Sequence, residues 1–381
     1  MKRIIISLSS IFLLASFSIA QKTIQPGDVS ISKIKFLSEF VVPYNQSFKG
    51  TTIGGLSGID YDGERKVYYL ISDDRSQKNA ARYYTAKILF SGRKIDTIQF
   101  VAVTTLLDPS GKPYPNSKKD PAHTPDPESL RYDPITRQMM WTSEGERIVN
   151  GNRNVLENPA ITIINPNGRY IDTFSLPYNL HMQATEKGPR QNETLEGLTF
   201  TNHFKTMYVS MEQPLYEDGP RAEVTENKPF IRIFKYDVST KKNTAQYAYK
   251  LDPVAHPAIL ASAFKINGIS DILAISDTKL LVLERSFSMG RMACTIKVFI
   301  SDLKNATNIS KNPSLKRNTD FVPATKKLLL NMDDLGMYID NLEGMTFGPV
   351  LPNGHRSLLF VADNNFSLFE KTQFLLFEVI P

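Results

Sequence analysis

The chain has 381 residues and a formal net charge of +6, with 45 Lys and Arg against 39 Asp and Glu. This basic excess is small and contains no run of five basic residues, so the composition argues against a nucleic-acid-binding protein. Cys294 is the single cysteine, which excludes an intrachain disulfide. The hydrophobic core must therefore stabilise the fold without covalent cross-links.

The first twenty residues have the pattern of a secretory signal peptide. Lys2 and Arg3 precede an apolar stretch, and Ser18-Ile19-Ala20 supplies the small residues of a cleavage site. The apolar stretch is short for a membrane anchor, and no other stretch is long enough to span a bilayer. We therefore expect cleavage after Ala20 and a secreted or periplasmic protein with one domain over residues 21–381.

Short runs rich in Val, Ile, Tyr, Phe and Thr alternate with turn residues along the rest of the chain. In order, they include KIKFLSEFVVP, VYYLISDD, RYYTAKILF, IDTIQFVAV, PAITIINPNG, YIDTFSLP, TMYVSME, FIRIFKYDV, LLVLERSF, TIKVFISDL, SLLFVADN and FLLFEVI. Such runs are typical of β-strands, and no later stretch has sustained helical periodicity. The pattern predicts an all-β protein.

One acidic phrase recurs along the chain. Residues 193–200 read ETLEGLTF and residues 340–347 read DNLEGMTF. Segments with the same apolar alternation occur at intervals of 71, 68, 75 and 72 residues, beginning at Ser57, Glu128, Glu196, Asp271 and Glu343. A regular period of this kind predicts a repeated structural unit.

Each repeated segment precedes a second strand that ends at or near an acid. These acids are Asp73, Glu144, Glu212, Glu284 and Asp363. Two further strands complete a unit, so the repeat predicts a β-propeller of four-stranded antiparallel blades. Five blades are apparent, and six remain possible if a long loop hides strands. The last unit lacks one strand, which residues 33–43 would supply, closing the ring and covering its open edge.

The repeated acids should lie together at one end of the propeller channel. Side chains alternate along a strand, and two antiparallel neighbours bring the start of one strand beside the end of the other. Converging carboxylates repel one another unless a cation lies between them, and Ca²⁺ prefers oxygen ligands. The predicted Ca²⁺ ligands are Glu128, Glu196, Asp271, Glu343, Glu144, Glu212, Glu284, Asp73 and Asp363.

Two arginines, Arg75 and Arg285, follow second-strand acids closely and are candidates for binding phosphate through paired hydrogen bonds. The alternative is structural, because acids and arginines in register also form ordinary ion-pair networks. The five histidines lack the spacing of a zinc site, and no G-x-S-x-G motif of a serine hydrolase occurs.

Several phrases together resemble one known family. GGLSGIDYD with YYLISDDR, NETLEGLTFT with MYVSMEQPL, GISDILAI with LLVLERSFSMG, and IDNLEGMTFGP with LLFVADNNF are similar to the phytase-like family, described as "esterase-like activity of phytase". The resemblance runs from about residue 34 to the C-terminus. It implies a secreted or periplasmic propeller that hydrolyses phosphoric esters, with Ca²⁺ in the channel mouth that binds phosphate and activates water.

Our leading hypothesis is a metal-dependent phosphoric-ester hydrolase acting on a small phosphorylated or anionic substrate. Glu128, Glu196 and Glu343 are the predicted catalytic residues, and we expect a monomer. Two alternatives stay open at this point. One is a non-catalytic propeller that binds a glycan, peptide or protein, since a fold does not determine a function. The other is a Ca²⁺-dependent lactonase or carboxylic-ester hydrolase.

Overall fold

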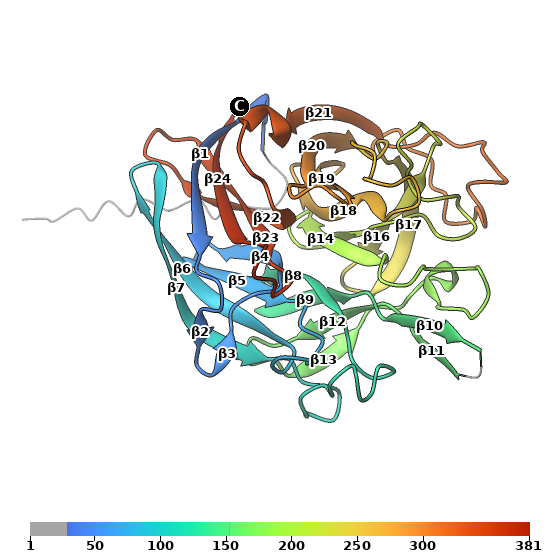
Figure 1. Cartoon of the computed structure of the whole chain (residues 1–381), viewed down its shortest axis with the longest axis horizontal. Helices are drawn as coiled ribbons and strands as arrows, with labels where there is room; N and C mark the ends of the chain where they lie inside the picture. The colour runs from blue at the N-terminus through green and yellow to red at the C-terminus, as the bar shows by residue number, and fades with distance from the viewer. Residues whose placement is uncertain (1–28, 152) are drawn as a thin grey trace, which may run out of the picture.

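The computed structural model describes residues 29–151 and 153–381, so the predicted signal peptide lies outside the described residues. The described strands form five four-stranded antiparallel sheets arranged as the blades of a ring (Figure 1). The predicted five-bladed propeller is confirmed, and the six-bladed alternative is wrong. Within the described residues, the helical elements are two short 3-10 turns, Tyr178–Leu180 and Met332–Leu335.

The blades follow one another along the chain, and each begins with its innermost strand. Blade 1 contains β4 (Leu56–Asp62), β5 (Val67–Ser72), β6 (Arg82–Ser91) and β7 (Lys94–Thr105). Blade 2 contains β8 (Pro127–Asp133), β9 (Gln138–Ser143), β12 (Ala160–Ile164) and β13 (Tyr170–Thr173). Blade 3 contains β14 (Leu195–Thr201), β15 (Thr206–Met211), β16 (Phe230–Asp237) and β17 (Lys242–Lys250).

The last two blades complete the ring. Blade 4 contains β18 (Lys265–Ala274), β19 (Lys279–Ser288), β20 (Thr295–Asp302) and β21 (Thr325–Asn331). Blade 5 contains β22 (Asn341–Val350), β23 (Arg356–Asp363), β24 (Thr372–Ile380) and, from the other end of the chain, β1 (Lys33–Val42).

The N-terminal strand closes the ring, as predicted. β1 pairs antiparallel with β24, with Lys33 opposite Ile380 and Val42 opposite Thr372 (Figure 1). This pairing satisfies the backbone groups that the outer edge of β24 would otherwise expose.

Two small hairpins extend beyond the blades. β10 (Glu146–Asn150) pairs with β11 (Arg153–Glu157) between the second and third strands of blade 2, and β2 (Ser47–Phe48) pairs with β3 (Thr51–Thr52). The long segment 107–126 adds no strand to a blade. In the described part of the chain, no helix has the length and apolar character needed to cross a membrane.

Every inner strand contains a β-bulge at the repeated phrase. The pairing register shifts between residues 56 and 58 in β4, 127 and 130 in β8, 195 and 198 in β14, 269 and 271 in β18, and 342 and 344 in β22. A bulge inserts one unpaired residue and bends the strand, which redirects its side chain. The repeat therefore encodes the same local bend five times at the same end of the ring.

The glycine of the phrase is required by close approach of neighbouring inner strands. A Cβ added at Gly197 would collide with the backbone of Asp271 and Ile272 in blade 4. At Gly58 it would lie 2.7 Å from the carbonyl oxygen of Glu128 in blade 2. The Glu-Gly pair thus places an acid at the bend and lets the next blade pack closely against it.

Candidate functional site

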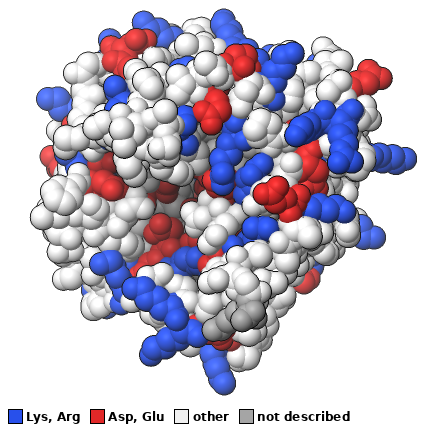
Figure 2. Space-filling view, turned by 45° about the vertical axis from the view of Figure 1, so that its right-hand side comes forward, with Lys and Arg blue, Asp and Glu red and all other residues white. Residues whose placement is uncertain are grey.

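A cavity of about 820 Å³ opens at the end of the ring where the five bulges lie. Among the described residues, eleven acidic side chains and four arginines line it, so its wall carries a large excess of negative charge. Figure 2 shows acidic side chains gathered in a hollow of the surface, with uncharged and basic side chains around it. Acids that lie this close require a compensating positive charge or bound protons.

The strand register defines two equivalent positions in each blade. In each inner strand, the last paired residue before the bulge has one partner in the second strand. The first position is the residue that follows it in the inner strand, and the second position is the residue that follows its partner in the second strand. In chain order these pairs are Ser57 and Asp73, Glu128 and Glu144, Glu196 and Glu212, Ser270 and Arg285, and Glu343 and Asp363. Blade 4 therefore differs from the others, because it presents a serine and an arginine.

The sequence alignment of blade 4 is off by one residue, and the structure corrects it. Asp271 and Glu284 do not line the cavity, because side chains alternate and a shift of one residue reverses the face. Asp271 accepts hydrogen bonds from Arg131 Nη2 at 3.0 and 2.8 Å. Glu284 accepts hydrogen bonds from Tyr249 Oη at 2.7 Å and Lys326 Nζ at 2.6 Å. Both carboxylates are engaged away from the acidic cluster.

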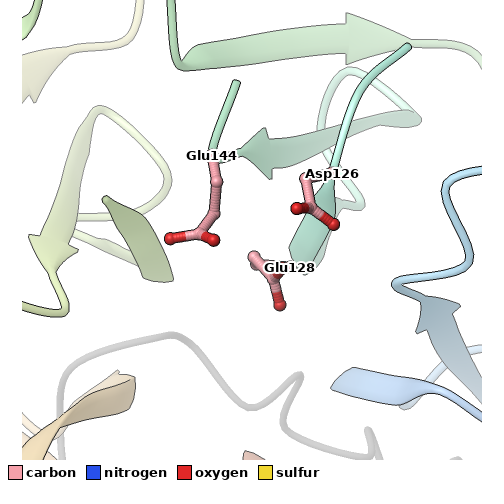
Figure 3. Close-up of side chains that lie close together, drawn as sticks. All are labelled: Asp126, Glu128 and Glu144. Atoms are coloured by element: carbon pink, nitrogen blue, oxygen red, sulfur yellow. The ribbon is translucent and has the colours of Figure 1, made fainter. Parts of the chain in front are cut away.

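Two triads of carboxylates meet in the cavity and share one member. Asp126, Glu128 and Glu144 each offer an oxygen within 4.8 Å of the others, and so do Glu144, Glu196 and Glu212. Figure 3 shows the first triad, with side chains that converge from the start of β8 and the end of β9. Sequence reasoning missed Asp126, although it precedes Glu128 by two residues and strand alternation could have found it.

The triad side chains are buried and poorly compensated. Glu128 and Glu196 are 8% and 7% exposed, and neither carboxylate makes a hydrogen bond or ion pair within the part of the chain that the structure describes. Burial raises the pKa of Asp126 to about 7 and that of Glu212 to about 8. Burial and neighbouring carboxylates raise the pKa well above the usual range in Glu128, Glu144 and Glu196.

The other acids of the ring lie at the same mouth, in blades 1 and 5. Burial and the charge of Glu343 raise the pKa of Asp73 well above its usual range, and burial and Asp73 do the same for Asp363. Glu343 itself accepts a hydrogen bond from Asn341 Nδ2 at 2.8 Å through Oε1. The structure therefore brings together seven of the nine predicted ligands, all except those of blade 4.

The two predicted phosphate-binding arginines are both engaged by acids. Arg285 lies in the cavity, where Nη2 donates to Glu212 at 3.0 Å and lies 3.7 Å from Glu343 Oε1. Arg75 does not line the cavity. Its Nη1 lies 3.5 Å from Asp126 and 2.9 Å from Glu146. Arg285 can therefore contact a ligand in the cavity, whereas Arg75 lies outside the cavity and pairs with Asp126 of the first triad.

A third arginine, which the sequence did not single out, occupies the channel axis. Arg131 is 3% exposed, and its Nε donates to the carbonyl oxygen of Leu198 at 2.7 Å. Its Nη1 donates to the carbonyl oxygen of Ile59, and its Nη2 donates to Asp271. Asp271 also accepts from the backbone N–H of Met345 at 2.8 Å. This network joins the inner strands of all five blades beneath the acidic mouth.

Fold and site together define a five-bladed β-propeller with an acidic cavity at one channel mouth. A family model described as "Phytase-like: Esterase-like activity of phytase" matches residues 51–366. The chain belongs to this family, as its repeated phrases predicted. No curated protein matches the sequence.

The solved structures with some similarity have varied names, among them an endo-arabinase, a β-1,3-galactosidase and a propeller. The endo-arabinase from Bacteroides thetaiotaomicron VPI-5482 is 13% identical, with 88% of this chain and 98% of that chain covered and a TM-score of 0.44. A β-1,3-galactosidase solved with galactodeoxynojirimycin is 9% identical, with coverages of 89% and 94% and a TM-score of 0.47. The Dos1 propeller is 8% identical, with coverages of 85% and 68% and a TM-score of 0.31. Similarity at this level does not bear on activity.

Proposed function

We propose that this protein is a Ca²⁺-dependent phosphoric-ester hydrolase. The observation that carries the proposal is the pair of buried carboxylate triads that share Glu144. Glu128 and Glu196 have no counter-charge in direct contact within the described residues, so the cluster is suited to a cation. Membership of the phytase-like family supports ester hydrolysis as the class of reaction.

The donor set fits a hard divalent cation. The triads supply only carboxylate oxygens, which Ca²⁺ prefers and can arrange in flexible geometry. Asp126, Glu128 and Glu144 would hold one ion, and Glu144, Glu196 and Glu212 a second. Bound Ca²⁺ would attract the phosphate group into an otherwise repulsive cavity and promote ionisation of water.

Glu343 is the residue best placed to move a proton. Both of its contacts, with Asn341 and Arg285, involve Oε1. Oε2 makes no hydrogen bond to the described residues, and Glu343 lines the cavity. Burial raises the pKa of Glu343 above the usual range of a carboxyl group, which makes it a stronger base when ionised. Glu343 would accept the proton of the attacking water, while Arg285 faces the phosphate oxygens.

The test is hydrolysis of p-nitrophenyl phosphate by purified protein, first treated with a chelator and then supplied with Ca²⁺. We expect activity only with Ca²⁺, together with bound calcium in elemental analysis. A lactone and p-nitrophenyl acetate serve as comparison substrates. Turnover of these two alone would replace the proposal with a lactonase or carboxylic-ester hydrolase. The absence of both turnover and calcium binding would refute the proposal.

We further propose that the mature protein is a secreted or periplasmic monomer that begins near Gln21 and does not bind nucleic acid. The signal-like N-terminus and the small charge excess support this. N-terminal sequencing of exported protein checks the cleavage site, its mass in solution checks the monomer, and a gel-shift assay with DNA and RNA checks the absence of nucleic-acid binding.

A further inference from the structure

The acidic cavity has an apolar lip on one side. Phe264, Met292 and Phe369 line the cavity and are 52%, 78% and 81% exposed, respectively. Phe264 precedes β18, and Met292 lies in the turn between β19 and β20, so blade 4 supplies most of this lip. Exposed apolar side chains at the entrance of a cavity indicate a binding surface more strongly than scattered ones do.

Contacts between the two loops of blade 4 hold the lip in place. The ring centroids of Phe264 and Phe287 are 6.2 Å apart, and the N–H of Met289 donates to the carbonyl oxygen of Phe264 at 2.9 Å. Gly290 follows with a φ of 96°, a conformation that favours glycine, and allows the turn that presents Met292. Contacts within blade 4 therefore fix the part of the lip that contains Phe264 and Met292.

An arginine accompanies the apolar side chains. Arg291 lines the cavity, and its guanidinium makes no ion pair or hydrogen bond within the described part of the chain. The other arginines of the cavity wall are engaged: Arg285 by Glu212, Arg221 by Glu193, and Arg147 by the backbone carbonyl oxygens of residues 183–185. Arg291 is thus the cavity arginine with its hydrogen-bond donors still available to an anion.

The part of the cavity wall that blade 3 supplies, next to blade 4 in the ring, has a different character. Tyr216 lies between two guanidinium groups, with Arg147 at 5.0 Å and Arg190 at 4.3 Å from the centre of its ring. Gln191 and Asn192 line the cavity nearby. The entrance therefore combines polar side chains from blade 3 with an apolar lip, which blade 4 mostly supplies, and with Arg291, which is unpaired among the described residues.

We propose, on the basis of the function proposed above, that the substrate is a phosphoric ester of an apolar alcohol, alkyl or aryl. The phosphate would lie over the carboxylate triads and near Arg291, and the alcohol group would lie against Phe264, Met292 and Phe369. A polyhydroxylated alcohol would gain little from this lip, since its hydroxyls would lose water without finding partners there.

The test separates binding from turnover by using phosphonates, whose C–P bond is not hydrolysed. Methyl phosphonate and pentyl phosphonate share one head group and differ only in apolar length, and each buried methylene strengthens binding about fourfold. Calorimetric titration of the Ca²⁺-loaded protein should show pentyl phosphonate binding at least about tenfold more tightly than methyl phosphonate. Equal affinities would overturn the proposal, even if p-nitrophenyl phosphate is hydrolysed.

Variants assign the preference to the lip. Met292→Ser and Phe264→Ser should each bring the two affinities closer together, whereas Ile135→Ser should not. Ile135 is 65% exposed in the β8–β9 turn, at the other end of the ring, and is the matched control. Arg291→Gln should weaken both phosphonates equally. A tail preference that survives both lip variants would overturn the assignment to blade 4, as it would place the apolar group elsewhere.

Discussion

Blades 3 and 4 have the same architecture but opposite charge at the channel mouth. Each is formed by four consecutive antiparallel strands, and each inner strand has one bulge at the same place. At the two equivalent positions, blade 3 carries Glu196 and Glu212, whereas blade 4 carries Ser270 and Arg285. The backbone repeat thus determines where a side chain reaches the mouth, and the local sequence determines which charge it brings.

Because of this difference, different blades supply the cation-binding side chains and the side chains suited to an organic anion. Blades 2 and 3 supply both carboxylate triads, which suit cations. Blade 4 supplies Arg285, Arg291 and most of the apolar lip, which suit the anionic and apolar parts of a ligand. A ring with the same acid in all five blades would bind cations but would have no side chains dedicated to the organic ligand.

The largest effect is expected for Asp271→Asn, which removes the acid that lies beneath the mouth in blade 4. The variant breaks the shorter of the two ion pairs of the buried Arg131 guanidinium and leaves Asp60, whose Oδ1 lies 3.9 Å from Nη1. Breaking a buried pair costs about 3–5 kcal/mol of unfolding free energy, and Asp60 offsets part of that loss. Urea unfolding in chelator measures the loss. Calcium affinity should not change, and a large drop in it would contradict the placement of Asp271 outside the cation site.

The second effect is expected for Glu196→Gln, which removes a triad charge in blade 3. With chelator, the variant should be more stable than the natural protein, because a buried charge among like charges is lost. With Ca²⁺ at about 100 times its Kd at each triad, the natural protein should gain about 2.7 kcal/mol for each bound ion, and the variant should lose the gain from the triad that contains Glu196. Thermal unfolding with and without Ca²⁺ measures both the higher stability of the variant in chelator and its smaller gain with Ca²⁺. Equal gains in the two proteins would exclude Glu196 as a ligand.

A matched pair of variants tests the register of blade 4 directly. Glu212→Gln in blade 3 should weaken calcium binding about tenfold, or about 1.4 kcal/mol, because Glu212 belongs to a triad. Glu284→Gln in blade 4 should leave calcium binding unchanged, since its partners are Tyr249 and Lys326. Calcium titration of both proteins provides the comparison. Similar losses of calcium affinity in the two variants would support the sequence register that places Glu284 in the cation site and would contradict the register of the structure.

The smallest effect is the pH dependence of stability without metal. The folded pKa of Asp126 is about 7 and that of Glu212 about 8, above the usual values near 4 of an unfolded chain. Between those limits the folded state binds more protons, so its stability decreases as the pH rises from about 4 to 8. Melting temperatures measured in chelator should fall over this range. Ca²⁺ should reduce the fall, because it replaces protons among the ionised carboxylates.

The bulge explains why sequence reasoning worked for four blades and failed for one. In blades 2, 3 and 5 the acid at the bulge precedes Gly or Ser and a clear apolar alternation, as in Glu196-Gly197-Leu198. In β18 the residues from Ile272 to Ile275 are all apolar, so alternation fits either register. Aligning on the acid then placed Asp271 where Ser270 lies. Only the pairing of Ile269 with Glu284 resolves the two choices.

The sequence by itself determined the strand content, the period of the repeat and the closing strand, because these depend on local patterns and on chain order. The structure decided between five and six blades. Tertiary structure alone decided which acids share a site, since Glu144 of blade 2 meets Glu196 and Glu212 of blade 3, which are distant in the chain. It also decided that Arg75 supports the cluster from behind and that Arg131 fills the channel axis. Such roles depend on long side chains that reach between blades, and a strand pattern carries no information about that reach.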